Sequence, residues 1–372
     1  MNNTYDVIII GAGGAGLMTA RTLGDLKLKV LVVDKKADLL NLPFKTLGSF
    51  INIEEFDLPE DTISSYIKKG TIYSKHFSCT GSGKAFIIDK VNLHKSLLDT
   101  IDRKFVDILI ATRIQDFDVD DNKNICAITD NKGNKYSAKY YVDATGLAGI
   151  FSKKLGLQDK TTNSAVGLEY NVSYRGDPNE VHFFIGKEFQ GGYGWIFPLR
   201  DKRAILGFGS FENIVVKELK LRLNKMLSND KISQLVVKDN DHAEGGSIPI
   251  TEVKNKFICQ NLICVGDSVS QVNPIVGEGY KYIFKSAVFA SNSIFKAISM
   301  DNPVYLKEYE EEWNTHYYDR YRVAKDLQKT LARFSKYDSI IDLGILFLKT
   351  KRHKTFERLF SGEFSKRDLY LP

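Results

Sequence analysis

The chain begins with two apolar runs, at residues 5–10 and 28–33, and apolar residues recur at helical spacing between them, at 17–26. Runs in which nearly every residue is apolar are typical of strands buried on both faces of a parallel sheet. Residues 141–144 and 262–265 form further runs of this kind. The pattern therefore predicts a parallel sheet whose strands come from distant parts of the chain and are covered by helices.

The middle of the chain has a different texture. From about residue 166 to 208, short strand-like segments alternate with turns that contain glycine or proline, which indicates a mainly antiparallel sheet. Because residues 257–265 return to the first sheet, we expect the second sheet to be inserted within the first domain.

We therefore predict an α/β protein with a Rossmann-like nucleotide-binding domain, an inserted, mainly antiparallel β-sheet domain for the substrate, and a helical C-terminal region. The expected boundaries are 1–75, 90–165 and 256–300 for the first domain, 76–89 and 166–255 for the second, and 301–372 for the helical region. Residues 39–56, interrupted by proline and glycine, are expected to be a loop that returns across the site.

A glycine fingerprint follows the first strand directly. Gly11, Gly13 and Gly16 have the spacing Gly-x-Gly-x-x-Gly, and the second strand ends in Asp34. The first glycine allows a tight turn, the second lets the backbone approach a pyrophosphate, and the third lets helix and strand pack closely, while the acid accepts ribose hydroxyls. This register predicts a dinucleotide site. NAD sites share the motif, and the lysines that follow the acid would suit the 2′-phosphate of NADP.

A second turn of the same kind lies about 250 residues later. Gly266 and Asp267 follow the run at 262–265, and a proline corner with Gly277 and Gly279 precedes a helical run that extends to about residue 298. A strand that ends in glycines and opens a helix offers backbone N–H groups to an anion. Two such turns indicate a ligand long enough to be held at both ends, and FAD fits this description.

Composition and charge narrow the class of protein. The 372 residues are 43% hydrophobic and 26% charged, as expected for a folded protein of two or three domains. The formal charge is +6, and residues 349–372 hold seven Lys and Arg against three Asp and Glu. This basic tail is either a solvated helix or a contact for phosphates or an anionic membrane surface. We expect no nucleic-acid partner.

The cysteines and the chain ends bear on metal binding and location. Four cysteines without a Cys-x-x-Cys pair, and no histidine at a metal-like spacing from them, predict that the protein holds no metal. The polar residues 1–4 run straight into the first strand, so we expect no signal peptide, and no apolar run is long enough to span a bilayer. We therefore expect a cytoplasmic protein that contacts membranes at most peripherally.

Five motifs resemble those of FAD-dependent oxidoreductases that share a fold with p-hydroxybenzoate hydroxylase, and within that group those of the geranylgeranyl reductase family. They are the glycine fingerprint, Asp143-Ala144-Thr145-Gly146, Gly266-Asp267, the Asn-Pro-Ile-Val-Gly-Glu-Gly segment at 273–279, and the Gly-Tyr-Gly-Trp-Ile-Phe-Pro segment at 192–198. The resemblance covers roughly residues 5–300. The first four motifs imply the fold and FAD, and the last is similar to the reductases in particular.

The resemblance also implies which residues hold the cofactor. They are Gly11, Gly13, Ala15, Gly16, Asp34, Lys35, Lys90, Ile114, Gly266, Asp267, Gly277, Gly279 and Tyr280. Asp267 would bond the ribityl chain, and backbone N–H groups near Gly279 and Tyr280 would face the N1–O2 edge of the flavin. Two positions depart from the family, because Lys90 replaces an arginine and Leu47 stands where many of these reductases have a cysteine. No role of that cysteine carries over.

Tyr193, Trp195 and Phe197 alternate at strand spacing and therefore share one face of a sheet. Packing within a core would explain such a stripe, but the resemblance favours an aromatic wall of an apolar cavity for an isoprenoid substrate. Reduction of an alkene also requires a proton. The candidate catalytic residues are Tyr193, Tyr280 and Glu278, beside ordered water, and the sequence singles out none of them.

The resulting expectation is an FAD-dependent oxidoreductase that reduces carbon–carbon double bonds of a polyprenyl lipid of the geranylgeranyl type. The sequence has no second glycine fingerprint, so the reductant would be transiently bound NAD(P)H or a ferredoxin-like electron-donor protein. The alternatives are a flavin-dependent monooxygenase or halogenase-like enzyme, a lycopene-cyclase-like enzyme without net redox change, and a lipid-binding protein without catalysis.

Overall fold

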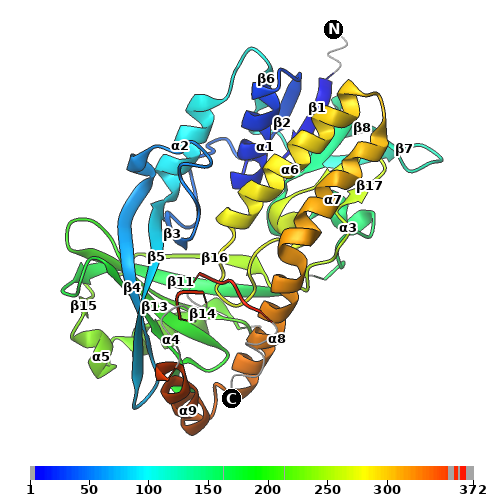
Figure 1. Ribbon diagram of the computed structural model, residues 1–372. Helices are drawn as coiled ribbons and strands as arrows, with labels where there is room; N and C mark the ends of the chain where they lie inside the picture. Colours follow the sequence, from blue (N-terminus) through cyan, green and yellow to red (C-terminus); the bar gives the residue numbers. More distant parts are fainter. Residues whose placement is uncertain (1–4, 162, 213, 351–355, 359–360, 366–372) are drawn as a thin grey trace.

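The computed structural model describes residues 5–161, 163–212, 214–350, 356–358 and 361–365. These residues form two lobes, each built around one large β-sheet, and long helices run along one side from the first lobe to the second (Figure 1). The basic tail predicted from residue 349 lies largely outside the described residues.

The first lobe contains a six-stranded sheet with the order β17-β18-β10-β1-β2-β6. Its strands are β1 (Tyr5–Ile10), β2 (Val30–Val33), β6 (Val106–Leu109), β10 (Ala138–Asp143), β17 (Ile258–Cys259) and β18 (Leu262–Cys264). All neighbouring pairs are parallel except β17 and β18. The central strands are buried on both faces, which explains why their sequences are continuous apolar runs.

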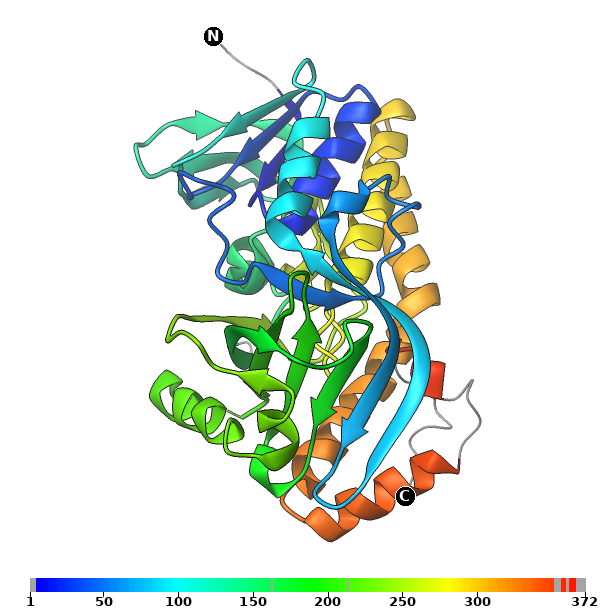
Figure 2. The same cartoon turned by 90° about the vertical axis from the view of Figure 1, so that its left-hand side faces the viewer.

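Helices and a smaller sheet cover this core. The helices are α1 (Gly14–Asp25), α2 (Lys90–Thr100), α3 (Ile150–Lys154) and α6 (Tyr280–Ser299), and the small sheet comprises β7 (Ile114–Val119), β8 (Ile125–Asp130) and β9 (Lys135–Tyr136). Helix α1 packs between α2 and α6 (Figure 2). The N-termini of α1 and α6 thereby point toward the second lobe from neighbouring positions.

The second lobe contains a nine-stranded sheet with the order β15-β11-β14-β13-β12-β4-β5-β3, in which β16 also pairs with β11. Its strands are β3 (Thr46–Ser49), β4 (Ile63–Tyr73), β5 (Ser78–Asp89), β11 (Ser164–Tyr174), β12 (Glu180–Phe184), β13 (Gly192–Pro198), β14 (Arg203–Ser210), β15 (Val236–Val237) and β16 (Ala243–Pro249). Helices α4 (Val216–Met226) and α5 (Asp230–Ser233) pack on one face, where side chains such as Leu168, Tyr170 and Phe208 form a second core. The other face is turned toward the first lobe.

The boundary between the lobes differs from the one predicted from the sequence. Strands β3 and β4 pair with β5, so residues 46–49 and 63–73 belong to the second sheet, whereas Ile51, Phe56 and Leu58 between them pack in the core of the first lobe. The long β4–β5 hairpin curves along the whole second lobe (Figure 2). Polar residues interrupt β4, which reads Ile-Ser-Ser-Tyr-Ile-Lys-Lys-Gly-Thr-Ile-Tyr, and therefore hide its strand period.

The C-terminal region connects the two lobes. Helices α7 (Lys307–Trp313) and α8 (Asp319–Phe334) are joined by a π-helical turn, and α9 (Asp338–Lys349) packs beneath the β4–β5 hairpin (Figure 1). Buried aromatic side chains fix α7 to the first lobe, where Trp313 meets Phe257 edge-on with ring centroids 5.2 Å apart. Within the described ranges, no helix is long and apolar enough to cross a membrane.

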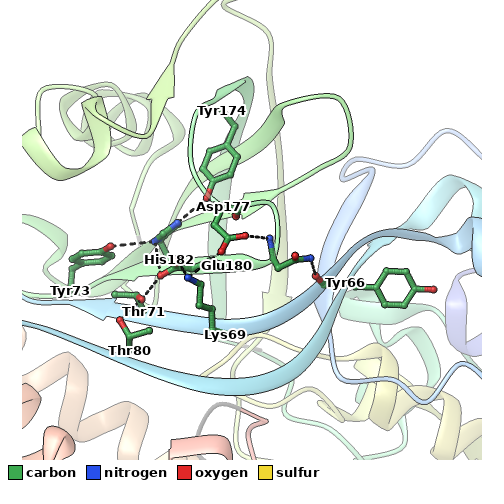
Figure 3. A network of polar contacts seen from close by, with 10 residues as sticks. Tyr66, Lys69, Thr71, Tyr73, Thr80, Tyr174, Asp177, Glu180 and His182 are labelled. Atoms are coloured by element: carbon green, nitrogen blue, oxygen red, sulfur yellow. Dashed lines mark hydrogen bonds and ion pairs between the residues drawn. The ribbon is translucent and has the colours of Figure 1, made fainter.

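A buried polar cluster holds the second sheet together where β4 and β12 run parallel (Figure 3). His182 lies between two phenols, with Nε2 2.9 Å from the hydroxyl of Tyr174 and Nδ1 3.4 Å from that of Tyr73. Beside it, Lys69 forms an ion pair with Glu180 at 3.0 Å. Burial lowers the pKa of His182, so the imidazole is neutral and serves as a structural hydrogen-bonding group.

Candidate active site

The glycine fingerprint forms a tight passage from β1 into α1. Gly11 has a φ of +104°, and a β-carbon there would lie 2.3 Å from the carbonyl oxygen of Ala144 on the neighbouring strand. A β-carbon at Gly16 would lie 1.9 Å from the oxygen of Gly11. Around Gly13, in contrast, no atom lies within 4 Å of a built β-carbon. The first and third glycines thus allow close packing, and the second faces open space at the N-terminus of α1.

Asp34 connects the glycine loop to the segment that follows β2. Its carboxylate accepts the backbone N–H of Ala12 at 2.7 Å and that of Lys36 at 2.8 Å. A carboxylate has about four acceptor sites, so Asp34 retains capacity for ribose hydroxyls. Lys35 beside it is exposed, whereas Ile114 lies in the core of the first lobe and does not line the cavity described next. Their cofactor roles stay predictions.

A cavity of about 410 Å³ extends between the lobes from the glycine loop to the second sheet. At one end it is bounded by Gly13, Gly14 and Ala15 at the start of α1 and by Gly277, Gly279 and Tyr280 at the start of α6. At the other end Tyr193, Trp195 and Phe197 line it from one face of β13. Leu47, at the position of the missing cysteine, also lines it.

Glycines make room for the aromatic wall. Gly207 on β14 lies directly opposite Trp195, and a β-carbon at Gly207 would come within 2.1 Å of the indole Cε2. Neighbouring rings in the wall have centroids 5.8 Å apart for Tyr193 and Trp195 and 6.0 Å apart for Trp195 and Phe197. The indole therefore lies flat on the sheet and leaves the space in front of it open.

The second glycine turn is held from outside the first lobe. Gly266 and Gly277 both have positive φ, of +68° and +69°. The side-chain amide of Asn273 donates to the carbonyl of Gly362 at 3.1 Å, and its side-chain oxygen accepts the backbone N–H of Ile275 at 3.1 Å. Gln328 on α8 donates to the carbonyl of Pro274 at 2.8 Å. The C-terminal region therefore braces the 273–279 loop.

Charged and aromatic groups converge where the two turns meet. Tyr280 begins α6, and its hydroxyl lies 2.7 Å from Nε2 of His94. The ammonium of Lys90 stands 5.7 Å from the centre of the Tyr280 ring. Burial lowers the pKa of Lys90 to about 8 and that of His94 to about 3, and it raises the pKa of Asp267 to about 6. Sequence reasoning missed His94, because its contact with residue 280 appears only in the folded chain.

Of the three candidate proton donors, Tyr193 and Tyr280 line the cavity but have hydrogen-bonded hydroxyls, and Glu278 does not line the cavity. The hydroxyl of Tyr193 donates to the carbonyl of Val276 at 3.0 Å. Glu278 accepts the hydroxyl of Ser49 at 2.8 Å and the backbone N–H of Lys281 at 2.9 Å, and it does not line the cavity. This carboxyl group fixes β3 to the start of α6, so it orients the loop.

A buried carboxyl group that the sequence did not single out lies in the cavity wall. Glu169 on β11 is only 5% exposed, and its Oε1 has no hydrogen-bond partner among the described residues. Burial raises its pKa to about 8. Alternation along β11 carries the missing signal, because the flanking Leu168 and Tyr170 face the second core and force residue 169 to the opposite side.

The residues present fit FAD. The N-termini of α1 and α6 lie at one end of the cavity; the N-cap residue of α1, Gly13, has no side chain to occupy its N–H groups, and at α6 Glu278 accepts the N–H of Lys281. Open space faces Gly13, and Nδ1 of His94 is buried without a partner among the described residues. A long ligand with a pyrophosphate in its middle would satisfy these groups.

The sequence pattern of the family described as FAD binding domain matches residues 4–316, which is most of the chain. The chain belongs to this family of FAD-binding proteins. It is similar to digeranylgeranylglycerophospholipid reductase 1 of Methanococcoides burtonii, with 24% identity over 372 aligned residues that cover 94% of this chain and 88% of that protein. The resemblance found in the sequence is thereby confirmed, and the protein is an FAD-dependent oxidoreductase.

Solved structures share the fold. A geranylgeranyl bacteriochlorophyll reductase-like protein from Thermoplasma acidophilum has a TM-score of 0.85 at 19% identity, over 98% of this chain and 97% of that one. A Pseudomonas aeruginosa protein described as a probable FAD-dependent monooxygenase has a TM-score of 0.72 at 18% identity, over 91% of this chain and 98% of that one. The predicted fold class is confirmed. Within the described ranges, no three His, Cys, Asp or Glu side chains form a candidate metal site.

Proposed function

We propose that this FAD-dependent oxidoreductase saturates carbon–carbon double bonds in the polyprenyl chains of a geranylgeranyl-type lipid. The observation that carries the proposal is the apolar cavity, which runs from the cofactor loops to the aromatic wall of Tyr193, Trp195 and Phe197. A wall of large apolar surfaces suits an isoprenoid chain. The similarity to digeranylgeranylglycerophospholipid reductases, over nearly the whole chain, supports this substrate class.

The residues of this chain divide the work between the two ends of the cavity. When bound, reduced FAD supplies the hydride. The glycine loop and Asp34 would hold its pyrophosphate and ribose, and Asp267 and the N-terminus of α6 would hold the flavin end. The aromatic wall would exclude water and align the double bond. The reductant in this proposal is NAD(P)H or a ferredoxin-like protein that docks transiently.

The proposal includes a cytoplasmic protein that works at an anionic membrane surface. Ile340, Leu343 and Leu346 form an exposed apolar stripe on α9, at a spacing of three residues. Lys336 precedes the helix and Lys349 ends it. An apolar stripe between cations suits the interface of a bilayer that contains anionic lipids.

The test is an anaerobic reaction in two stages. The purified protein is reduced without oxygen, a geranylgeranyl glycerophospholipid is added, and both the flavin absorbance and the mass of the lipid are followed. Reoxidation of the flavin together with a lipid gain of two hydrogens per double bond is the expected result. No saturated product across several chain lengths would sink the proposal.

The same assay separates the alternatives. A lycopene-cyclase-like enzyme would give a product of unchanged mass. A monooxygenase or halogenase-like enzyme would leave the lipid intact and would act on an aromatic compound only after oxygen enters. A protein that binds the lipid but converts neither substrate would be a lipid-binding protein.

A further inference from the structure

The proposed reduction requires a proton, and the cavity wall offers few groups that hold one in a suitable position. The hydroxyl of Tyr193 is bound to the carbonyl of Val276, and that of Tyr280 is bound to His94. Burial raises the pKa of both phenols far above the ordinary value, so they release a proton reluctantly. Asp267 lies at the cofactor end.

Glu169 is differently placed. It projects from β11 into the cavity beside the aromatic wall, on the substrate side. Neither its Oε1 nor Nε1 of Trp195, another residue of this wall, has a hydrogen-bond partner among the described residues. Burial disfavours the carboxylate more than the nearby ammonium of Lys90 and indole N–H of Trp195 favour it, so the site favours the neutral acid, which carries the proton.

A second glutamate, which is partly exposed to solvent, lies beside this acid. Glu244 on β16 lies directly opposite Glu169 in the antiparallel pair β11–β16. Side chains at opposite positions lie on the same face of a sheet, with β-carbons about 5 Å apart. The side chain of Glu244 is 20% exposed and is held by Lys45, whose ammonium lies 2.8 Å away and whose backbone N–H donates to it at 3.1 Å. The carboxyl group of Glu169 is therefore shielded from solvent, whereas that of Glu244 is accessible to it.

We propose that Glu169 is the proton donor of the alkene reduction and that Glu244 returns a proton to it from solvent. This inference rests on the proposed function. One carbon of the double bond receives the hydride taken from the reduced cofactor, and the other forms a C–H bond with the proton of Glu169. The O–H bond of Glu169 breaks with its electron pair left on the carboxylate, and uptake of one proton through Glu244 restores the acid.

The charges around Glu169 agree with this cycle. Burial and the nearby charge of Glu244 raise its pKa to about 8, whereas Lys90 on α2 and the indole N–H of Trp195 lower it. Burial lowers the pKa of Lys90 itself, and among its neighbours Asp267 raises this pKa and Lys36 lowers it. The acid is thus protonated at neutral pH, and after it has given up its proton the ammonium of Lys90 stabilises the carboxylate that remains.

The experiment compares wild type with Glu169→Gln, Glu169→Asp, Glu244→Gln and the control Glu218→Gln, which changes a surface glutamate of α4. Each protein is loaded with FAD, reduced without oxygen and mixed with a geranylgeranyl glycerophospholipid. FAD content, lipid affinity, the rate of lipid saturation and its pH profile are measured. An infrared band of a protonated carboxyl group, present at pH 7 in wild type and absent in Glu169→Gln, reports the acid without turnover.

Glu169→Gln is expected to keep its FAD and its lipid affinity within about threefold while saturation slows by about a hundredfold or more. Glu169→Asp should recover part of the rate, and Glu218→Gln should match wild type. The wild-type rate should fall as pH rises through about 8, because the proton donor is lost. Glu244→Gln removes a neighbouring negative charge, so this fall should move to lower pH.

Saturation by Glu169→Gln at close to the wild-type rate would overturn the inference and leave the proposed function intact. A wild-type protein that saturates no lipid would instead overturn the proposed function. If Glu169→Gln does not retain FAD, the pH profiles decide, and identical profiles for wild type and Glu244→Gln would reject the relay.

Discussion

The ring of Tyr280 lies against Gly14, and a β-carbon at residue 14 would stand only 2.8 Å from Cε1 of that ring. Gly14 is the first residue of α1 and Tyr280 is the first residue of α6. The N-termini of the two helices therefore meet at one contact, although about 260 residues separate them in the chain. This contact joins the two glycine turns at which we propose that the pyrophosphate and the flavin of FAD are held.

Gly14 at this contact and its neighbour Gly13 should respond differently to substitution by alanine. In Gly13→Ala the new methyl group meets no protein atom within 4 Å, so the apoprotein should melt within a few degrees of wild type. The methyl stands where the pyrophosphate would approach, so FAD affinity should fall about tenfold or more. Gly14→Ala should lower both FAD affinity and apoprotein stability, because it displaces the Tyr280 ring. Thermal melts and FAD titrations check this, and an unchanged FAD affinity in Gly13→Ala would contradict the assigned cofactor position.

Gly207→Ala should narrow the substrate end alone. A methyl group at residue 207 would overlap the indole of Trp195 and push it into the cavity. We expect normal FAD content and a lipid affinity that falls about tenfold, measured by lipid-dependent changes in flavin fluorescence. Equal lipid affinity in the variant and wild type would mean that the lipid does not lie along this wall.

Glu278 should impose a pH dependence on the stability of the apoprotein. Burial raises its pKa from 4.5 to about 7 in the folded state. The folded state therefore holds the proton more tightly, and the stabilisation from protonation is complete below about pH 4.5 and lost as pH rises to about 7. One pKa unit corresponds to about 1.4 kcal/mol, so the loss is at most about 3 kcal/mol.

The measurement is urea unfolding of wild type and Glu278→Gln between about pH 4.5 and 7.5. The stability of wild type relative to the variant should decrease across this range, because the amide does not titrate. Glu218→Gln, an exposed substitution, serves as the control. A flat difference would show that folding does not raise the pKa of Glu278.

The stripe on α9 should govern binding to vesicles. Leu343→Glu combined with Leu346→Glu places two negative charges on the exposed apolar face and should weaken co-sedimentation with anionic vesicles several-fold. The matched control is Leu221→Glu, at a leucine that is 62% exposed on α4 in the second lobe. If the double variant on α9 sediments as well as the Leu221→Glu control, α9 is not the membrane contact.

How far the sequence predicts this structure depends on the range over which each signal acts. The passage from β1 through Gly11 and Gly16 to Asp34 follows from local rules, since strand, turn and helix are contiguous and each glycine has its own steric reason. The aromatic wall follows from strand alternation at residues 193–197. Both features are readable without knowledge of the tertiary fold.

The features that were missed depend on tertiary neighbours. Strand β4 contains serines and lysines, and its assignment as a strand depends on its parallel pairing with β12. His94 belongs to the site because it contacts Tyr280, and Glu169 belongs to it because its side chain lies on the sheet face that α4 does not cover. A local pattern cannot show that a polar residue will be buried, because the segments that bury it are distant in the sequence.

The brace on the 273–279 loop also sets an order of events during synthesis. The amide of Asn273 and the carbonyl of Pro274 are held by Gly362 and Gln328, which leave the ribosome long after the glycine loop at residues 11–16. A nascent chain can thus acquire its first strand and helix early, but the 273–279 loop is braced only after Gln328 and Gly362 have emerged. Full loading with the cofactor would accordingly require a chain that extends at least to residue 362.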